Sequence, residues 1–68
     1  MKRVDLSLLP ALHELLKTES VTRAADNLYL SQSAVSKMLT KLRSSFDDEL
    51  LIKSGRGFVR SKKADLLL

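Results

Sequence analysis

The chain has 68 residues and a net charge of +4, with no cysteine and a single histidine. A chain shorter than about 70–80 residues has one core, which seldom contributes more than about 3–5 kcal/mol of net stability, so we expect one compact, helix-rich domain. Without cysteine there is no disulfide or thiolate metal site, and the lone His13 cannot form an imidazole cluster, so no metal or cofactor is predicted.

The hydropathy of the sequence predicts neither a membrane-spanning segment nor a signal peptide. No apolar run approaches the roughly 20 residues that span a bilayer. Residues Met1 to Leu9 also lack the basic, apolar and small-residue regions of a signal peptide. We therefore expect a soluble cytoplasmic protein without a membrane partner.

The positive charge is concentrated in the second half of the chain. Basic and acidic residues balance up to Leu30, whereas residues 31–46 and 53–63 contain lysine and arginine but no acid. The opposing charge there is confined to Asp47, Asp48, Glu49 and Asp65. Acid-free basic segments indicate a surface that faces a polyanion, although a solvated basic surface remains the alternative.

The first predicted helix runs from Asp5 or Ser7 to about Thr18. Pro10 lacks an N–H and is comfortable only in a first turn, which favours Ser7 as the N-cap over Asp5 unless the helix bends there. Leucines at helical spacing predict its buried face: Leu6, Leu8, Leu9, Leu12, Leu15 and Leu16.

A second, two-turn helix is predicted over residues 21–28, with Ser20 as its N-cap. Such a short helix is not stable alone and must be held by tertiary packing. Ala24 and Ala25 are small enough to let another helix approach closely, so they predict a helix crossing.

Ser31 is expected to cap a third helix that runs to about Ser45. Its buried face is predicted to hold Val35, Met38, Leu39, Leu42 and Phe46. Short hydroxyls, an amide and cations line the opposite face, as base edges and phosphates require: Gln32, Ser33, Ser36, Lys37, Thr40 and Lys41.

A small β-hairpin is predicted next, with strands near residues 50–53 and 58–60 and a turn at Ser54-Gly55-Arg56-Gly57. A lone hairpin is marginal in water, so we expect either Leu51 or Ile52, and either Phe58 or Val59, to pack on the helices. Ser61 is predicted to cap a last helix that includes Leu66, Leu67 and Leu68 as apolar surface. Because the chain stops inside this helix, we expect a fragment of a longer protein.

Together these elements predict a helix-turn-helix over about residues 21–40, with Leu28 and Leu30 helping to bury the turn. The second helix of this motif enters the major groove of DNA by its N-terminal residues. Gln32, Ser33 and Ser36 are then candidates for base contacts, and Lys37 for a base or a phosphate. Arg56 either lies in solvent on a glycine turn or enters the minor groove from a wing.

Residues 20–64 resemble the N-terminal winged helix-turn-helix domain of LysR-type transcriptional regulators. The series T-R-A-A, S-Q-S-A-V-S, D-x-L and S-G-R-G carries the resemblance. It implies a mainly α fold with three helices, a two-stranded wing and the start of a linker helix. The domain is placed at residues 1–60, with its wing at about 50–60, and the linker start at 61–68.

The resemblance also implies a function and partners. It implies sequence-specific binding of double-stranded DNA by part of a bacterial regulator. In the intact protein, a linker helix and an effector domain outside this chain would form a homodimer or tetramer and bind a small-molecule effector.

Site residues follow from the matched positions and the polar helix face. Recognition-helix contacts are assigned to Gln32, Ser33, Ser36, Lys37 and Thr40. Phosphate contacts are assigned to Arg23, Ser31 and Lys41, and the wing contact to Arg56.

Two single positions and one short segment depart from the family pattern. Lys37 stands where arginine is more frequent, and an ammonium cannot form a bidentate fork to guanine. Tyr29 occupies the turn where glycine is common, so a positive φ there would be strained. The basic run Ser61-Lys62-Lys63 adds expected phosphate affinity.

There are three alternatives to DNA binding by a member of this family. An enzyme is not predicted, because no nucleophile, acid/base pair or metal site is assembled. A winged helix used for protein contact would carry an apolar stripe on the outer face of its third helix. A winged helix of another DNA-binding family is the remaining alternative, against which the G-R-G hairpin argues.

Overall fold

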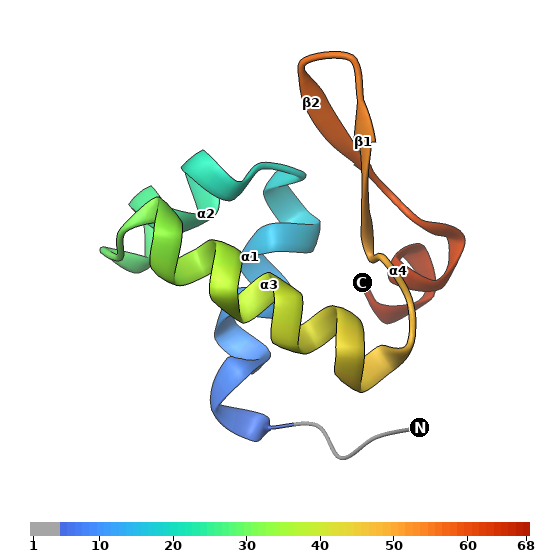
Figure 1. Cartoon of the computed structure of the whole chain (residues 1–68), viewed down its shortest axis with the longest axis horizontal. Coiled ribbons are helices and arrows are strands. Elements are labelled where there is room, and N and C mark those ends of the chain that lie inside the picture. The colour runs from blue at the N-terminus through green and yellow to red at the C-terminus, as the bar shows by residue number, and fades with distance from the viewer. Residues whose placement is uncertain (1–4) are drawn as a thin grey trace.

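The computed structural model describes residues 5–68 (Figure 1). The 3-10 turn η1 (Leu6–Leu8) leads into helices α1 (Leu9–Thr18), α2 (Val21–Leu28) and α3 (Gln32–Phe46). Strands β1 (Leu51–Ser54) and β2 (Gly57–Arg60) follow, and helix α4 (Lys62–Leu67) comes last. The predicted class, mainly α with a two-stranded wing, is confirmed. The expected domain start at residue 1 lies outside the described residues, as does the first part of the Met1 to Leu9 segment.

The start of the first helix differs from the prediction. Asp5, not Ser7, is the cap: its carboxylate accepts bonds from the Ser7 N–H (3.0 Å) and the Ser7 hydroxyl (2.7 Å). The chain makes a 3-10 turn first, and the α-helix begins beside Pro10, which has no N–H to donate to an earlier carbonyl. The change of helix type is the bend that allows Asp5 to serve as cap.

Two leucines that the helical spacing placed in the core are exposed, and the bend accounts for the first of them. Leu6 is 74% exposed and Leu9 is 42% exposed. A 3-10 turn has three residues per turn, so Leu6 falls out of phase with the buried stripe of the α-helix. The remaining predicted leucines are buried: Leu8, Leu12, Leu15 and Leu16.

The short helix α2 packs through its alanines, as predicted. Ala24 and Ala25 are fully buried in the core shared with α1 and α3. The Ser20 hydroxyl accepts a bond from the Arg23 N–H at 3.1 Å, which confirms the predicted cap.

The turn after α2 has three residues and ends the helix in a left-handed conformation. Tyr29 has a φ of 57°, and the Leu30 N–H bonds back to the Ala25 carbonyl at 3.0 Å. The strain expected of a non-glycine residue is therefore present at Tyr29. Leu30 is partly exposed, so its predicted burial is wrong: the backbone bond closes the turn, and that bond does not require a buried side chain.

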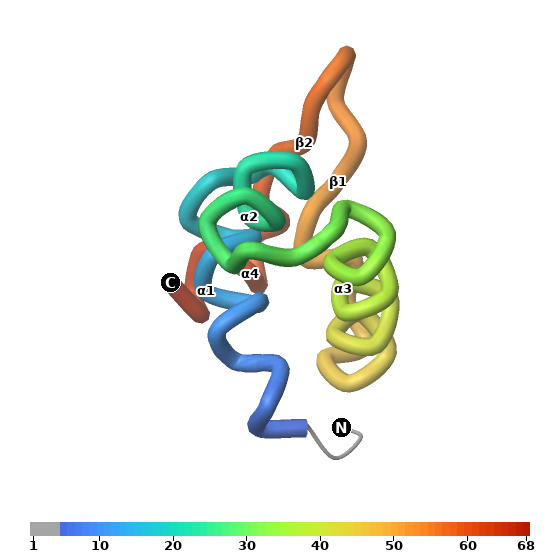
Figure 2. The backbone as a smooth tube through the Cα atoms, turned by 90° about the vertical axis from the view of Figure 1, so that its left-hand side faces the viewer, coloured from blue at the N-terminus to red at the C-terminus, as the bar shows by residue number. Residues whose placement is uncertain are grey.

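Helix α3 is capped by the Ser31 hydroxyl, which accepts a bond from the Ala34 N–H at 3.2 Å. Its predicted inner face is buried, with Met38 partly so. Figure 2 shows α3 across the molecule from α1 and α4, with the hairpin projecting beyond all of them.

The wing is antiparallel, with Leu51 paired to Arg60 and Ile52 paired to Val59. Opposite residues share a face of the hairpin and neighbouring residues alternate between faces. Leu51 and Phe58 therefore lie on the face that packs on the helices, whereas Ile52 and Val59 are exposed together. This pairing decides between the alternatives that the sequence left open.

Asp48 joins the two ends of the wing. Its Oδ2 accepts bonds from the Ser61 hydroxyl (2.7 Å) and the Leu50 N–H (2.8 Å). The Ser61 hydroxyl also accepts a bond from the Ala64 N–H and so caps α4, as predicted. These bonds, the Ser61 hydroxyl first, lower the pKa of Asp48 below its usual range.

Enlarging the helix crossing should destabilise the fold. Ala24→Leu is expected to lower the free energy of unfolding by about 1–3 kcal/mol, because the added atoms cannot fit between closely packed helices. Urea unfolding followed by circular dichroism measures this. The control is Asp26→Leu on the exposed side of α2, and an equal effect of both variants would contradict the crossing.

Acid should weaken the base of the wing. A carboxylate with a lowered pKa stabilises the fold above its ordinary pKa, and this stability is lost as the pH falls through the folded-state value. We expect Asp48→Asn to make the fall in unfolding free energy below about pH 4 shallower than in the parent. Asp5 and Glu14, whose pKa values are also lowered, leave a residual slope. Thermal melts at a series of pH values measure this fall for both proteins. If the unfolding free energy of the parent and of Asp48→Asn falls equally steeply with decreasing pH, Asp48 has no such role.

Candidate nucleic-acid interface

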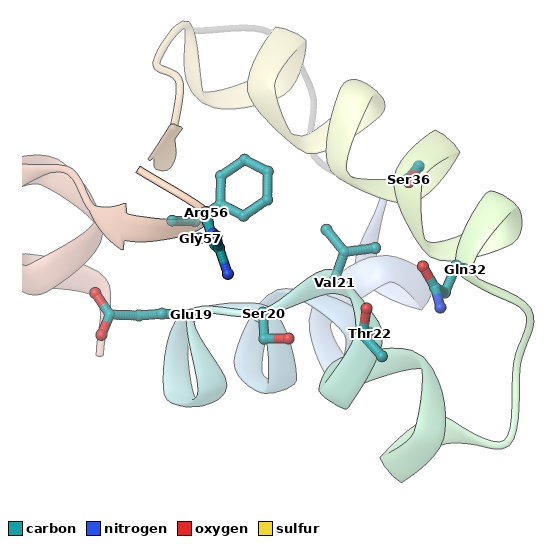
Figure 3. A pocket seen from close by; sticks show the side chains of 9 residues that line it. Glu19, Ser20, Val21, Thr22, Gln32, Ser36, Arg56 and Gly57 are labelled. Atoms are coloured by element: carbon teal, nitrogen blue, oxygen red, sulfur yellow. The ribbon is translucent and has the colours of Figure 1, made fainter. Parts of the chain in front are cut away.

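A hollow of about 310 Å³ lies between the start of α2, the start of α3 and the wing (Figure 3). We call it the α3–wing hollow. Three parts of the chain line it: Glu19, Ser20, Val21, Thr22, Gln32, Ser36, Arg56, Gly57 and Phe58.

Three of the predicted DNA contacts meet at this hollow. Gln32 and Ser36 come from successive turns of α3, and Arg56 comes from the tip of the wing. All three are exposed. The fold therefore brings the predicted base-reading helix and the predicted wing contact to the same concave surface, although they are separated by about 20 residues in sequence.

The other predicted recognition-helix residues lie on the exposed face of α3 but do not line the hollow. Ser33 and Lys37 are exposed there. Thr40 is exposed too, and its hydroxyl donates to the Ser36 carbonyl at 3.1 Å, so its hydrogen is already engaged.

The predicted phosphate contacts are dispersed. Arg23 is exposed on α2, and Lys41 lies further along α3, where its charge contributes to lowering the pKa of Asp5 after the two bonds from Ser7. The Ser31 hydroxyl caps α3 and lies 3.2 Å from the Ser33 hydroxyl, which leaves it less available to a phosphate.

Not all of the downstream basic residues face outward, which corrects the interpretation from charge alone. Arg43 donates from Nε to the Glu49 carbonyl and from Nη2 to the Leu51 carbonyl, both at 2.8 Å. Lys63 donates to the Phe46 carbonyl at 2.8 Å, at the end of α3. The extra phosphate affinity expected of Lys63 is thus reduced, because its ammonium is engaged within the fold.

Arg60 is the most connected residue at the base of the wing, and sequence reasoning missed it. Its backbone N–H donates to Glu19 Oε2 at 2.8 Å, and its side-chain Nη1 donates to the Leu16 carbonyl at 2.8 Å. Its Nε donates to Asp65 Oδ1 at 2.7 Å. The bond to Asp65, more than any other effect, raises the pKa of Arg60. The partners Glu19 and Leu16 lie 41 and 44 residues away in sequence, so no local pattern could signal them, whereas Asp65 lies only 5 residues away.

Thr22, which lines the hollow, is a second residue that sequence reasoning missed. It lies in the first turn of α2, two residues after the Ser20 cap. The free N–H groups of a first helical turn favour an anion nearby, and that position was the available signal.

Comparison with known proteins identifies the family. Residues 6–64 match the family described as bacterial regulatory helix-turn-helix protein, lysR family. The chain therefore belongs to the LysR family and forms its helix-turn-helix domain.

Individual relatives agree with this assignment. The chain is 44% identical over 66 residues to nodulation protein D 3 of Rhizobium meliloti, covering 97% of this chain and 21% of that protein. A probable transcriptional regulator from Pseudomonas aeruginosa, PA0477, matches with a TM-score of 0.89 and 37% identity, over 96% of this chain and 22% of its own. The chain thus spans about a fifth of the length of these relatives.

A structure of the BenM DNA-binding domain in complex with benA site 1 DNA shares the fold. Its TM-score is 0.81 at 22% identity, over 94% of this chain and 72% of that one.

Within the described part of the chain, no helix combines the length and apolar character needed to cross a membrane.

Proposed function

We propose that the chain binds double-stranded DNA in a sequence-specific manner, as the DNA-binding domain of a bacterial LysR-type regulator acting in the cytoplasm. The observation that carries the proposal is the shared hollow, where Gln32 and Ser36 of α3 meet Arg56 of the wing. This role is one of binding rather than catalysis.

In the proposed complex the N-terminal half of α3 lies in the major groove. Gln32, Ser33, Ser36 and Lys37 contact base edges, and Thr40 contacts the DNA further along the helix. Arg23, Ser31 and Lys41 contact phosphates on either side, although the cap bond of Ser31 weakens its contribution. Arg56 reaches the adjacent minor groove, whose negative potential attracts arginine.

The outer face of α3 favours DNA over a protein partner. A helix that docks on a protein needs apolar anchors on its exposed face. All of the predicted contacts on this face of α3 are exposed and polar. The BenM domain, which shares the fold, is described in complex with DNA, which is consistent with the proposal.

We further propose that the intact protein is a homodimer or tetramer joined by a linker helix that begins at residues 61–68. Its effector domain would bind a small molecule. The exposed leucines at the end of α4 and directly after it support the first point: Leu66, Leu67 and Leu68. Dimeric helix-turn-helix proteins bind two half-sites, so this fragment alone should bind more weakly than the intact protein.

Base readout by α3 can be tested on a duplex library across a salt series. Ser36→Ala and Lys37→Ala should each relax preference at particular base pairs by about 1–3 kcal/mol, because each removes a contact to a base edge. Lys62→Ala, an exposed lysine on α4, is the matched control and should weaken all sequences alike. If the parent binds no duplex even at low salt, where phosphate contacts are strongest, DNA binding by this surface is excluded.

The wing contact gives a separate prediction. Arg56→Ala should weaken binding mainly to duplexes with A·T-rich flanks, because the narrow minor groove there has the strongest negative potential. Fluorescence anisotropy on two duplexes that differ only in their flanks measures the difference. An equal loss on both flanks would instead make Arg56 a simple phosphate contact.

A further inference from the structure

The wing has little to hold its direction apart from its base. It is a single two-stranded hairpin, a unit that is marginal in water by itself. Its tip is open: a side chain built at Gly55 or Gly57 would meet nothing within 4 Å. Only Leu51 and Phe58 pack against the core. The direction of the tip is therefore set where the strands leave the helices.

The end of β2 is tied to the corner between α1 and α2 by Glu19. Its Oε2 accepts the Arg60 backbone N–H at 2.8 Å, and its Oε1 lies 3.8 Å from Arg60 Nη1. The same guanidinium caps the C-terminal end of α1 through the Leu16 carbonyl. Glu19 and Arg60 thus form a two-residue connection, which we call the wing clamp.

A small rotation of the wing at the wing clamp is enlarged at Arg56, because Arg56 lies far from the clamp along the strand. Arg56 precedes Arg60 by four residues, or about 13 Å of extended strand. A rotation of about 10° at the base would move the tip by about 2 Å, which is enough to break a hydrogen bond to DNA.

Glu19 is otherwise out of place. It lies at the edge of the α3–wing hollow, where a negative charge disfavours the approach of phosphates, although its carboxylate is directed away from Gln32 and Ser36 (Figure 3). It also adopts a left-handed conformation, with a φ of 53°, which is strained for a residue with a side chain. The left-handed conformation belongs to the cap that ends α1, where the Glu19 N–H bonds to the Leu15 carbonyl at 2.9 Å. The unfavourable charge is offset if the carboxylate holds the wing in place.

We infer that Glu19, acting through Arg60, is a positioning residue that sets the wing direction and thereby the contact of Arg56 with DNA. The inference rests on the proposed DNA-binding function. It predicts a different effect of removing Glu19 from the one expected if Glu19 acted only by its charge. Removing an acid near DNA should strengthen binding, whereas removing the wing clamp should abolish the contribution of Arg56.

A double-mutant cycle separates the two effects. Binding to one duplex with A·T-rich flanks is measured for the parent, Arg56→Ala, Glu19→Asn and the double variant. Asparagine tolerates the left-handed conformation, and its shorter side chain cannot reach the Arg60 N–H. We expect Arg56→Ala to weaken the parent about tenfold but to weaken Glu19→Asn by less than about twofold.

Two further variants serve as rescue and control. Glu19→Gln keeps an oxygen that can accept the Arg60 N–H, so Arg56→Ala should regain most of its tenfold effect in that background. Asp26→Asn removes the same charge from the exposed face of α2 and should leave the tenfold effect intact. Ser36→Ala should relax base preference equally with and without Glu19→Asn, because α3 does not depend on the wing clamp.

The outcomes are distinguishable. A tenfold effect of Arg56→Ala that persists in Glu19→Asn overturns the wing clamp while leaving DNA binding standing. A parent that binds no duplex overturns the proposed function itself. Thermal melts show whether Glu19→Asn folds; if it does not, Glu19→Gly, which adopts a positive φ without strain, replaces it in the same cycle.

Discussion

The geometry of the proposed interface depends on how the wing is attached to the helices. Leu50 is fully buried with a φ of 64°, a strained conformation for a branched side chain. Its N–H bonds to Asp48, and its carbonyl accepts the Ser61 N–H at 2.9 Å. These two bonds and the burial of Leu50 compensate for the strain and bring the two ends of the hairpin together.

Two arginines complete that attachment, one for each strand. Arg43 ties the start of β1 to α3, and Arg60 ties the end of β2 to α1 and α4. A hydrogen bond from a charged donor to a carbonyl is stronger than one from a neutral donor, so each arginine stabilises the attachment of its strand. Because each bond joins the strand to a helix, it also helps to fix the direction of the wing. The wing tip lines the same hollow as Gln32 and Ser36. Its direction follows from these contacts at the base, because a side chain built at Gly55 or Gly57 would meet nothing within 4 Å.

The helix-turn-helix was largely predictable because its determinants are local. Three serine caps at Ser20, Ser31 and Ser61 and the small residues of α2 were read from neighbouring positions, and the structure has them as expected. The start of the first helix was predicted wrongly because two local rules conflict there. Pro10 favoured Ser7 as a cap, but the chain inserts a 3-10 turn, and this turn gives the cap to Asp5 and exposes Leu6.

The sequence alone determined the helices, the hairpin, the polar face of α3 and the family resemblance, because periodicity, capping residues and turn residues act within a few positions. Tertiary structure alone decided which strand residues pack, which basic residues are engaged internally, and that Gln32, Ser36 and Arg56 share one hollow. Glu19 and Arg60 were unpredictable for the same reason. Their bond joins residues 41 positions apart, and only the folded chain brings them within hydrogen-bonding distance.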